Sequence, residues 1–439
     1  MVSPTAATTS VLVLTDTDSY VKWGAALASG FPPAWDVRLV IARSASRPSS
    51  SQVADALAGT RFEGREPQVV GLGELRSMLL GGRPDVLVLA ARGYTVQAAM
   101  SVVENVPDRP VVVTGLPGVG VPVLPYGLEF RRSADVFIVH SRRELREFTH
   151  ASRRLGLPPR FELARLPYLR ARHGVRADDD GPLVFAAQAL VPAGRRERAA
   201  LVERLAAAAR ARPDREVVIK IRARAGEAQT HHEQVPYEDL VDALDDRPPN
   251  LVVRTGPMHE HLERASGFVT VSSTALLEAI ALDVPSIALD DFGVGVSQIN
   301  LALTGSGLVG SGDDLVRGEL RSADARWCED NYFHDPAEDT WSTRVEDLLE
   351  RRRRGGLEPF LEAPGSWRNG VRRVIYRQFS FTDGSGQGGL SQAAERSVVQ
   401  AALWLNQRRS FLIRTMWRSP HGARAMEFAR ENSATAPRA

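Results

Sequence analysis

The sequence predicts an α/β protein made of two Rossmann-like, doubly wound domains with a C-terminal helical extension. The chain has 439 residues, which is more than one domain usually holds. Short runs rich in Val, Leu and Ile alternate with helical patterns, as expected for parallel strands covered by helices on both faces. This alternation stops at a polar stretch and then starts again, so it indicates two successive domains.

The first array of strands and helices defines an N-terminal domain over residues 1–175. Its apolar runs begin with "SVLVLTD" and end with "ADVFIVHS". Most of these runs are four to eight residues long and are bounded by polar or glycine-containing segments, which is typical of buried strands. The predicted strands are 10–16, 35–42, 67–72, 84–91, 109–115 and 134–141.

The second array defines a further Rossmann-like domain over residues 180–340. It follows the polar stretch "RHGVRADDDGP" at 172–182, which is typical of an interdomain linker. A long Ala- and Arg-rich helix, "RRERAALVERLAAAARARP", follows its first strand. The strands expected here are "PLVFAAQ", "REVVIKIRA", "NLVVRTG", "GFVTVSS" and "PSIALDD".

The basic helical extension covers residues 341–439. Its segments "RRRR" at 351–354 and "RRSFLIRTMWR" at 408–418 combine cationic and apolar side chains. Interfacial helices that bind anionic membranes have this composition. The alternative is a basic helix that packs on its own domain.

Composition restricts the classes of function. A formal net charge of +2 gives no sign of nucleic-acid binding. Cys328 is the only cysteine, so no intramolecular disulfide can form, and the N-terminus lacks the features of a signal peptide. We therefore expect a cytoplasmic protein, with the C-terminal helices as a candidate contact for the inner face of the membrane. Because no His/Cys/Asp spacing suits zinc, we expect no metal and no cofactor.

Three consecutive hydroxyl residues, Ser272, Ser273 and Thr274, stand where a predicted strand meets a helix. Ligands of parallel α/β sheets bind at the carboxyl ends of the strands. Hydroxyl donors and free N–H groups in the first turn of a helix suit a phosphate. Glu278 lies about one turn further on and could accept hydrogen bonds from a ribose. The alternative for the hydroxyls is simple N-capping of the helix.

Cations are expected near the same edge of the second domain. Lys220 ends a predicted strand, and it is one of only two lysines in the chain. Together with Arg222 it could neutralise a diphosphate or phosphate without a metal. Asp291, at the end of another predicted strand, is a further candidate contact for the ligand at this edge.

The segment "TDTDSYVKWG" after the first strand supplies the candidate catalytic residues. Asp18 is our predicted general base, with Asp16 as the second choice, because a carboxylate at the carboxyl end of a strand can take the proton of a substrate hydroxyl. The alternative for Asp18 is a role as helix cap. The predicted acceptor-binding residues are Tyr20, Lys22 and Arg92.

The segment "SSTALLEAIALDVPSIAL" resembles the nucleotide-binding segment of GT-B glycosyltransferases. In that family a hydroxyl-rich turn is followed by Glu-Ala and then by Gly-x-Pro. Glu278, Ala279 and Pro285 match this pattern, and Asp283 occupies the position of the glycine. The serine pair is similar, more distantly, to that of capsule sialyl and Kdo transferases and of glycerophosphate transferases. Those families carry a Lys-x-His-Pro-like segment, of which this chain has only Lys220.

A wider likeness spans roughly residues 10–335 and resembles a group of actinobacterial proteins described as glycosyltransferases. It includes "FAAQALVPAGRRER", from which we add Gln188 to the donor site. The resemblance implies a metal-independent GT-B enzyme of polysaccharide biosynthesis. Such an enzyme would move a sugar from a nucleotide-sugar to a hydroxyl of a cell-envelope glycan or glycolipid, with inversion. Two alternatives stay open: a glycerol-phosphate transferase with a CDP-linked donor, and a non-catalytic nucleotide-binding protein.

Overall fold

The computed structural model describes residues 8–44, 46–169, 180–188, 191–192, 194–222, 235–295, 298, 300–360 and 381. These residues fall into two compact units. Unit 1 takes those within Met1–Pro167 and Pro336–Ala439, and unit 2 takes those within Tyr168–Asp335.

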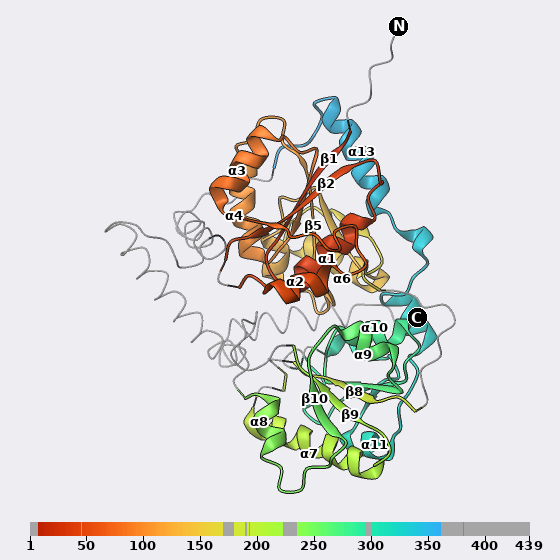
Figure 1. The fold of residues 1–439 in the computed structure, drawn as a ribbon. Helices are drawn as coiled ribbons and strands as arrows, with labels where there is room; N and C mark the ends of the chain where they lie inside the picture. The colour runs from red at the N-terminus through yellow and green to blue at the C-terminus, as the bar shows by residue number, and fades with distance from the viewer. Residues whose placement is uncertain are drawn as a thin grey trace. The chain divides into compact units, whose positions relative to one another are not determined.

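Unit 1 is built on a parallel sheet of seven strands in the order β3-β2-β1-β4-β5-β6-β7 (Figure 1). The central strands consist almost entirely of apolar residues, and β4 and β5 are buried along their whole length. That pattern is expected of parallel strands covered on both faces. The strands are β1 (Ser10–Thr15), β2 (Asp36–Ala42), β3 (Gln68–Val70), β4 (Val86–Ala90), β5 (Val111–Gly115), β6 (Val136–Val139) and β7 (Phe161–Leu163).

Helices follow most of the strands of unit 1, and they pack together as α1 with α2 and α3 with α4. The apolar core between helices and sheet includes Leu14, Leu87 and Leu89, which are fully buried. The helices are α1 (Asp18–Ser29), α2 (Ser50–Leu57), α3 (Leu72–Gly81), α4 (Gly93–Val103), α5 (Pro125–Glu129) and α6 (Arg142–Arg154).

Unit 2 repeats the same topology with a six-stranded parallel sheet, in the order β10-β9-β8-β11-β12-β13. The strands are β8 (Leu183–Ala186), β9 (Val217–Lys220), β10 (Leu251–Arg254), β11 (Gly267–Thr270), β12 (Ser286–Leu289) and β13 (Val309–Gly310). In Figure 1, α9 and α10 lie on one side of these strands and α7, α8 and α11 on the other. The helices are α7 (Arg195–Ala211), α8 (Tyr237–Asp242), α9 (Met258–Glu263), α10 (Ala275–Ala281), α11 (Gly312–Arg317) and α12 (Ala325–Asp330).

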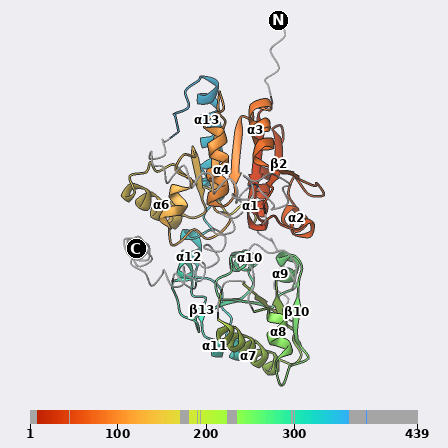
Figure 2. The same ribbon diagram turned by 90° about the vertical axis from the view of Figure 1, so that its left-hand side faces the viewer.

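The last described helix, α13 (Trp341–Arg353), belongs to unit 1 (Figure 2). It packs along β5, β6 and β7. The ring of Trp341 meets that of Phe31 edge to face at 5.3 Å. Arg352 donates to Asp85 at 2.6 Å, at the amino end of β4. The start of the predicted extension is thus a packed part of unit 1.

Both sheets have one topological switch point, where the direction of strand addition reverses. It lies between β1 and β4 in unit 1 and between β8 and β11 in unit 2. In open α/β sheets the crevice outside the carboxyl ends of these two strands is the usual ligand position. The strand order therefore marks one place in each unit where a site is expected.

The prediction of two Rossmann-like α/β domains is confirmed. The sequence missed β7 and β13, which have only three and two residues and lie at sheet edges. Most of the predicted linker 172–182 and of the extension lies outside the described residues, including the arginine-rich segment 408–418.

Candidate functional site

The switch point of unit 2 is bridged by Gln188 and Ser272. Gln188 follows β8 by two residues, and Ser272 follows β11 by two residues. The side-chain Oε1 of Gln188 accepts the backbone N–H of Ser272 at 3.0 Å and its hydroxyl at 3.2 Å. Two residues that sequence reasoning had assigned to the donor site are therefore brought together at the expected position.

The hydroxyl turn between β11 and α10 is organised by its own side chains. The Ser273 N–H donates to the hydroxyl oxygen of Thr270 at 2.9 Å, and the Ala275 N–H donates to that of Ser273 at 3.2 Å. Thr274 is the residue before α10, but its side chain makes no capping hydrogen bond. Ser272, Ser273 and Thr274 are all half-buried, so the turn remains partly open to solvent.

The predicted donor-site cations lie at the same edge of the sheet. Lys220 is the last residue of β9, which pairs with β8, and it stands opposite Ala186. Its carbonyl accepts the N–H of Ala187 at 3.0 Å, and its side chain is half-buried. Arg222, two residues further, is exposed. Glu278 lies in α10 and is half-buried.

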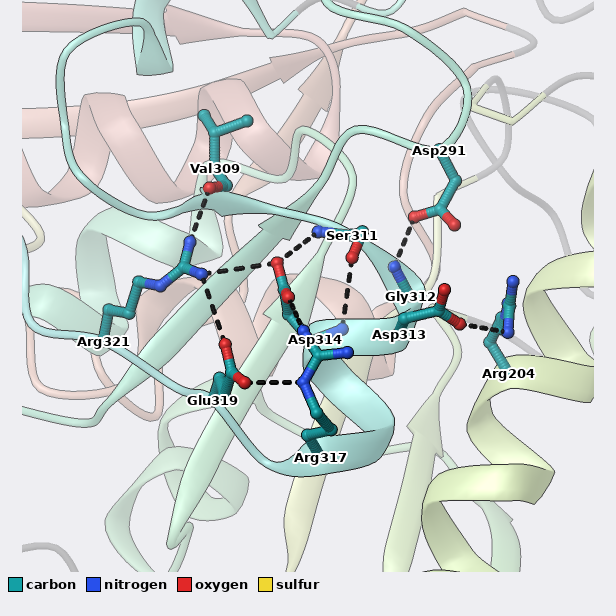
Figure 3. Close-up of polar contacts among 10 residues, drawn as sticks. All are labelled: Arg204, Asp291, Val309, Ser311, Gly312, Asp313, Asp314, Arg317, Glu319 and Arg321. Atoms are coloured by element: carbon teal, nitrogen blue, oxygen red, sulfur yellow. Dashed lines mark hydrogen bonds and ion pairs between the residues drawn. The ribbon is translucent and has the colours of Figure 1, made fainter.

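Asp291 follows β12 and turns toward α11 (Figure 3). Its Oδ2 accepts the N–H of Gly312, the first residue of that helix, at 2.7 Å. A carboxylate at this position satisfies an N–H that the helix leaves unpaired. Asp291 therefore lies at the start of α11, and its role toward a donor sugar stays a prediction.

A network of ion pairs surrounds the same helix. The N–H of Asp314 donates to the hydroxyl oxygen of Ser311 at 3.2 Å, while Asp314 Oδ2 accepts the Ser311 N–H at 3.0 Å. Arg317 and Arg321 both reach Asp314 (Figure 3). The hydrogen bond from the Ser311 backbone, followed by the hydroxyl of Ser311 and the two arginine charges, lowers the pKa of Asp314. Ser311 and Asp314 thus cap the first turn of α11.

An ion pair between Asp16 and Arg92 lies at the switch point of unit 1. Asp16 directly follows β1 and is fully buried, and Arg92 follows β4. Asp16 Oδ2 accepts from Arg92 Nε at 2.8 Å, from the Arg92 N–H at 3.1 Å and from the Thr95 hydroxyl at 2.8 Å. Asp16 Oδ1 has no hydrogen-bond partner among the described residues. These contacts fix both side chains of the pair.

Arg92 keeps part of its surface accessible. Its side chain is 23% exposed, and its Nη1 donates to the hydroxyl of Ser46 at 3.1 Å. Burial acts to lower the pKa of Arg92, but the charge of Asp16 and its hydrogen bond to Arg92 outweigh it and raise the pKa overall. Arg92 is thus permanently charged and held in one orientation.

The other predicted residues of unit 1 occupy different environments. Asp18 is the first residue of α1 and is half-buried. The residue before the helix is Thr17, which makes no side-chain cap. Lys22 is half-buried in the same helix. Tyr20 is in the core at 7% exposure, where burial raises the pKa of its hydroxyl and Arg131 donates to it at 2.9 Å.

Sequence reasoning missed a buried polar group at the same edge. His140 follows β6 and is fully buried. Its Nε2 lies 2.8 Å from the indole Nε1 of Trp23, and its Nδ1 lies 2.9 Å from the carbonyl oxygen of Ala164. Its Nε2 also lies 3.0 Å from the carbonyl oxygen of Leu116. A neutral ring with its proton on Nδ1 donates to Ala164 and accepts from Trp23. Burial lowers the pKa of His140, which keeps it neutral. The sequence signal for this group was a histidine directly after the apolar run "VFIV".

No group of three or more His, Cys, Asp or Glu side chains within the described residues could hold a metal ion. No helix in that part of the chain is long and apolar enough to span a membrane.

A family model described as "Putative glycosyltransferase (DUF6716)" matches residues 11–348. This match covers both sheets and most of α13. The chain belongs to this glycosyltransferase family. The family assignment confirms the resemblance to glycosyltransferases seen in the sequence. No match was found among curated proteins.

Solved structures support the fold. A chain described as "putative UDP-N-acetylglucosamine 2-epimerase from Listeria monocytogenes" has a TM-score of 0.53 at 11% identity, with 82% of this chain and 100% of that chain covered. S. aureus MnaA, solved with UDP, has a TM-score of 0.50 at 10% identity, with 81% and 100% covered. At this level of identity the likeness shows a shared two-domain fold and nothing about substrate.

Proposed function

We propose that the protein is a metal-independent, inverting GT-B glycosyltransferase that uses a nucleotide-sugar and glycosylates a hydroxyl of a cell-envelope glycan or glycolipid. The observation that carries the proposal is the contact between Gln188 and Ser272 across the switch point of unit 2. This contact supports the proposal because it lies beside a partly exposed hydroxyl turn, at the edge where open α/β sheets usually bind ligands.

In unit 2, the proposed donor site uses neutral donors and nearby cations. Ser272, Ser273 and Thr274 offer hydroxyl and N–H groups to a phosphate, and Glu278 contacts the ribose. Lys220 and Arg222 supply positive charge that stabilises the departing nucleotide, as cations do in phosphate recognition. UDP is the first nucleotide to test, because the fold relative MnaA was solved with UDP.

In unit 1, the proposed general base is Asp18 rather than Asp16. A general base must reach the acceptor hydroxyl and exchange its proton. Asp18 is half-buried at the start of α1, whereas Asp16 is fully buried and already accepts three hydrogen bonds on one oxygen. Arg92 and Lys22 remain as contacts for the acceptor, and the buried Tyr20 contributes to the core behind them.

Titration calorimetry with UDP, CDP, GDP and CMP tests the donor site. We expect one of these nucleotides to bind, and Ser273→Ala to weaken its binding about five- to tenfold through a lost hydrogen bond. Ser266→Ala is the matched control, because Ser266 lies at the opposite end of β11 and donates to the Gly181 carbonyl. Failure of the native protein to bind any of the four would refute the proposal.

Release of the free nucleotide from its sugar conjugate, in the presence of a cell-envelope glycolipid extract, tests turnover. Asp18→Asn should lower kcat about 10²- to 10⁴-fold, while Asp36→Asn, an exposed aspartate at the amino end of β2, should not. The mass of the product distinguishes transfer of a sugar from transfer of glycerol phosphate. Nucleotide binding with no release by the native protein would indicate a non-catalytic binding protein.

A further inference from the structure

Unit 2 contains a buried arginine that no sequence argument had singled out. Arg198 lies in the first turn of α7 and is only 1% exposed. A guanidinium group is costly to remove from water unless its N–H groups are paired. The groups that accept its hydrogen bonds therefore indicate which part of the fold Arg198 holds in place.

Arg198 donates to three main-chain carbonyl groups, two in the connection between β8 and α7 and one just before α8. Its Nη2 donates to Gln188 at 2.9 Å, its Nε to Pro192 at 2.9 Å and its Nη1 to Val235 at 2.7 Å. The guanidinium also lies 5.0 Å from the centre of the Tyr237 ring, and Tyr237 is itself fully buried. A planar fork with fixed donor directions suits this task, because it holds several carbonyl groups in one geometry.

One of the three carbonyl groups belongs to a residue of the proposed donor site. The backbone of Gln188 is held by Arg198, and the side chain of Gln188 accepts two hydrogen bonds from Ser272. The contacts form a continuous chain from the buried arginine through Gln188 to the hydroxyl turn. A displacement of the Gln188 backbone would therefore move the acceptor atom that orients Ser272.

We propose that Arg198 is a positioning residue for the nucleotide site: it fixes the main chain at Gln188, so that the Gln188 side chain holds Ser272 in its ligand-binding geometry. This inference rests on the proposed function, since it assumes that the hydroxyl turn binds the nucleotide. Arg198 itself does not touch the nucleotide. Small displacements of positioning groups are enough to weaken a preorganised site.

Binding of UDP to Arg198→Lys, measured by titration calorimetry well below the melting temperature, tests the proposal. CDP, GDP or CMP replaces UDP if the native protein prefers it. Lysine keeps the charge but cannot span three carbonyl groups. We expect the affinity to fall about tenfold, the effect of losing roughly one well-oriented hydrogen bond. Arg198→Met, if it folds, should lose more.

Arg131→Lys is the matched control for loss of stability. Arg131 is also a buried arginine, at 4% exposure, and donates to the main-chain carbonyl of Ala91 at 2.8 Å, but it belongs to unit 1. Its substitution should lower the melting temperature while changing nucleotide affinity less than twofold. Equal losses of affinity in both lysine variants would overturn the proposal, because they would indicate a general effect of reduced stability.

A double-mutant cycle separates positioning through Gln188 from a purely structural role. If Arg198 acts through Gln188, Arg198→Lys should add little to the loss of affinity already caused by Gln188→Ala. Fully additive losses, or native affinity in Arg198→Lys, would refute the inference and leave the donor site intact. No nucleotide binding by the native protein would instead refute the proposed function, and this inference with it.

Discussion

The two switch points of the protein have the same topology but different chemistry. In unit 1 a buried carboxylate, Asp16, pairs with Arg92 at 2.8 Å. In unit 2 the neutral side chain of Gln188 bridges to Ser272 at 3.0 and 3.2 Å. A buried ion pair is hard to break, because removal of one partner leaves the other charge desolvated. Neutral hydrogen bonds on a partly exposed turn can be exchanged for those of a ligand at low cost.

This difference indicates how each unit is suited to its proposed task. The unit 1 ion pair holds Arg92, the proposed acceptor contact, in one orientation. The unit 2 turn keeps hydroxyl and N–H groups whose present partners are weak enough for a phosphate to replace. Four changes test this comparison, from the largest expected effect to the smallest.

Asp16→Ala should have the largest effect. It leaves the Arg92 guanidinium and the Thr95 hydroxyl without their acceptor, and loss of one partner of a buried ion pair costs about 3–5 kcal/mol. Urea denaturation measures the loss, and hydrogen exchange should locate it in β1 and β4 but not in β8 and β11. A loss below about 1 kcal/mol would contradict the importance given to this pair.

Acidification should destabilise unit 1 through His140. Because burial lowers the pKa of His140 below its ordinary 6.5, the unfolded chain binds a proton on this residue that the folded chain does not. The contribution of His140 is therefore fully present above about pH 6.5 and is lost as the pH falls, at up to about 1.4 kcal/mol per pH unit. Denaturation between about pH 8 and pH 5 measures it.

His140→Gln is the control for this pH dependence, because its amide can both accept from Trp23 and donate to Ala164 without titrating. The variant should lose stability less steeply on acidification than the native protein. An identical slope in both proteins would show that other groups cause the pH dependence.

Gln188→Ala should destabilise unit 2 only moderately. It removes one neutral acceptor and leaves a half-buried turn that water can reach, so the expected cost is about 1 kcal/mol. Urea denaturation compared with Asp16→Ala gives the contrast directly. If the two variants lost equal stability, the proposed difference between the switch points would not hold.

Asp313→Ala should have the smallest effect. Its ion pair with Arg204 is exposed, with side-chain exposures of 45% for Arg204 and 63% for Asp313 (Figure 3). Exposed pairs contribute about 0–1 kcal/mol. A melting temperature close to that of the native protein would confirm that burial, rather than the presence of an ion pair, makes the Asp16–Arg92 contact strong.

One departure from the GT-B sequence pattern is explained by the backbone. Asp283 occupies the position of the glycine in the Gly-x-Pro pattern, and its φ is +54°. It follows the end of α10, and its N–H donates to the carbonyl of Ile280 at 3.0 Å. A left-handed residue commonly ends a helix, and aspartate tolerates this conformation better than most residues. The chain thus has a left-handed residue at the position where the pattern has glycine.

The two arrays of parallel strands could be predicted from the sequence alone, because continuous apolar runs indicate strands that are buried on both faces of a sheet. The sequence also indicated the hydroxyl turn, because those residues follow a strand directly. It did not reveal β7 and β13, because these edge strands, "FEL" and "VG", lack the run of Val, Leu and Ile residues that marked the other strands.

Only the tertiary structure brought Asp16 to Arg92, His140 to Trp23 and Arg198 to Gln188. The first two pairs are separated by 76 and 117 positions. The local sequence around each residue therefore does not predict the contact. The physical reason is that a side chain's burial and partners depend on which strands become neighbours in the sheet. That order decided which aspartate of "TDTD" is buried in an ion pair and which remains accessible as the proposed base.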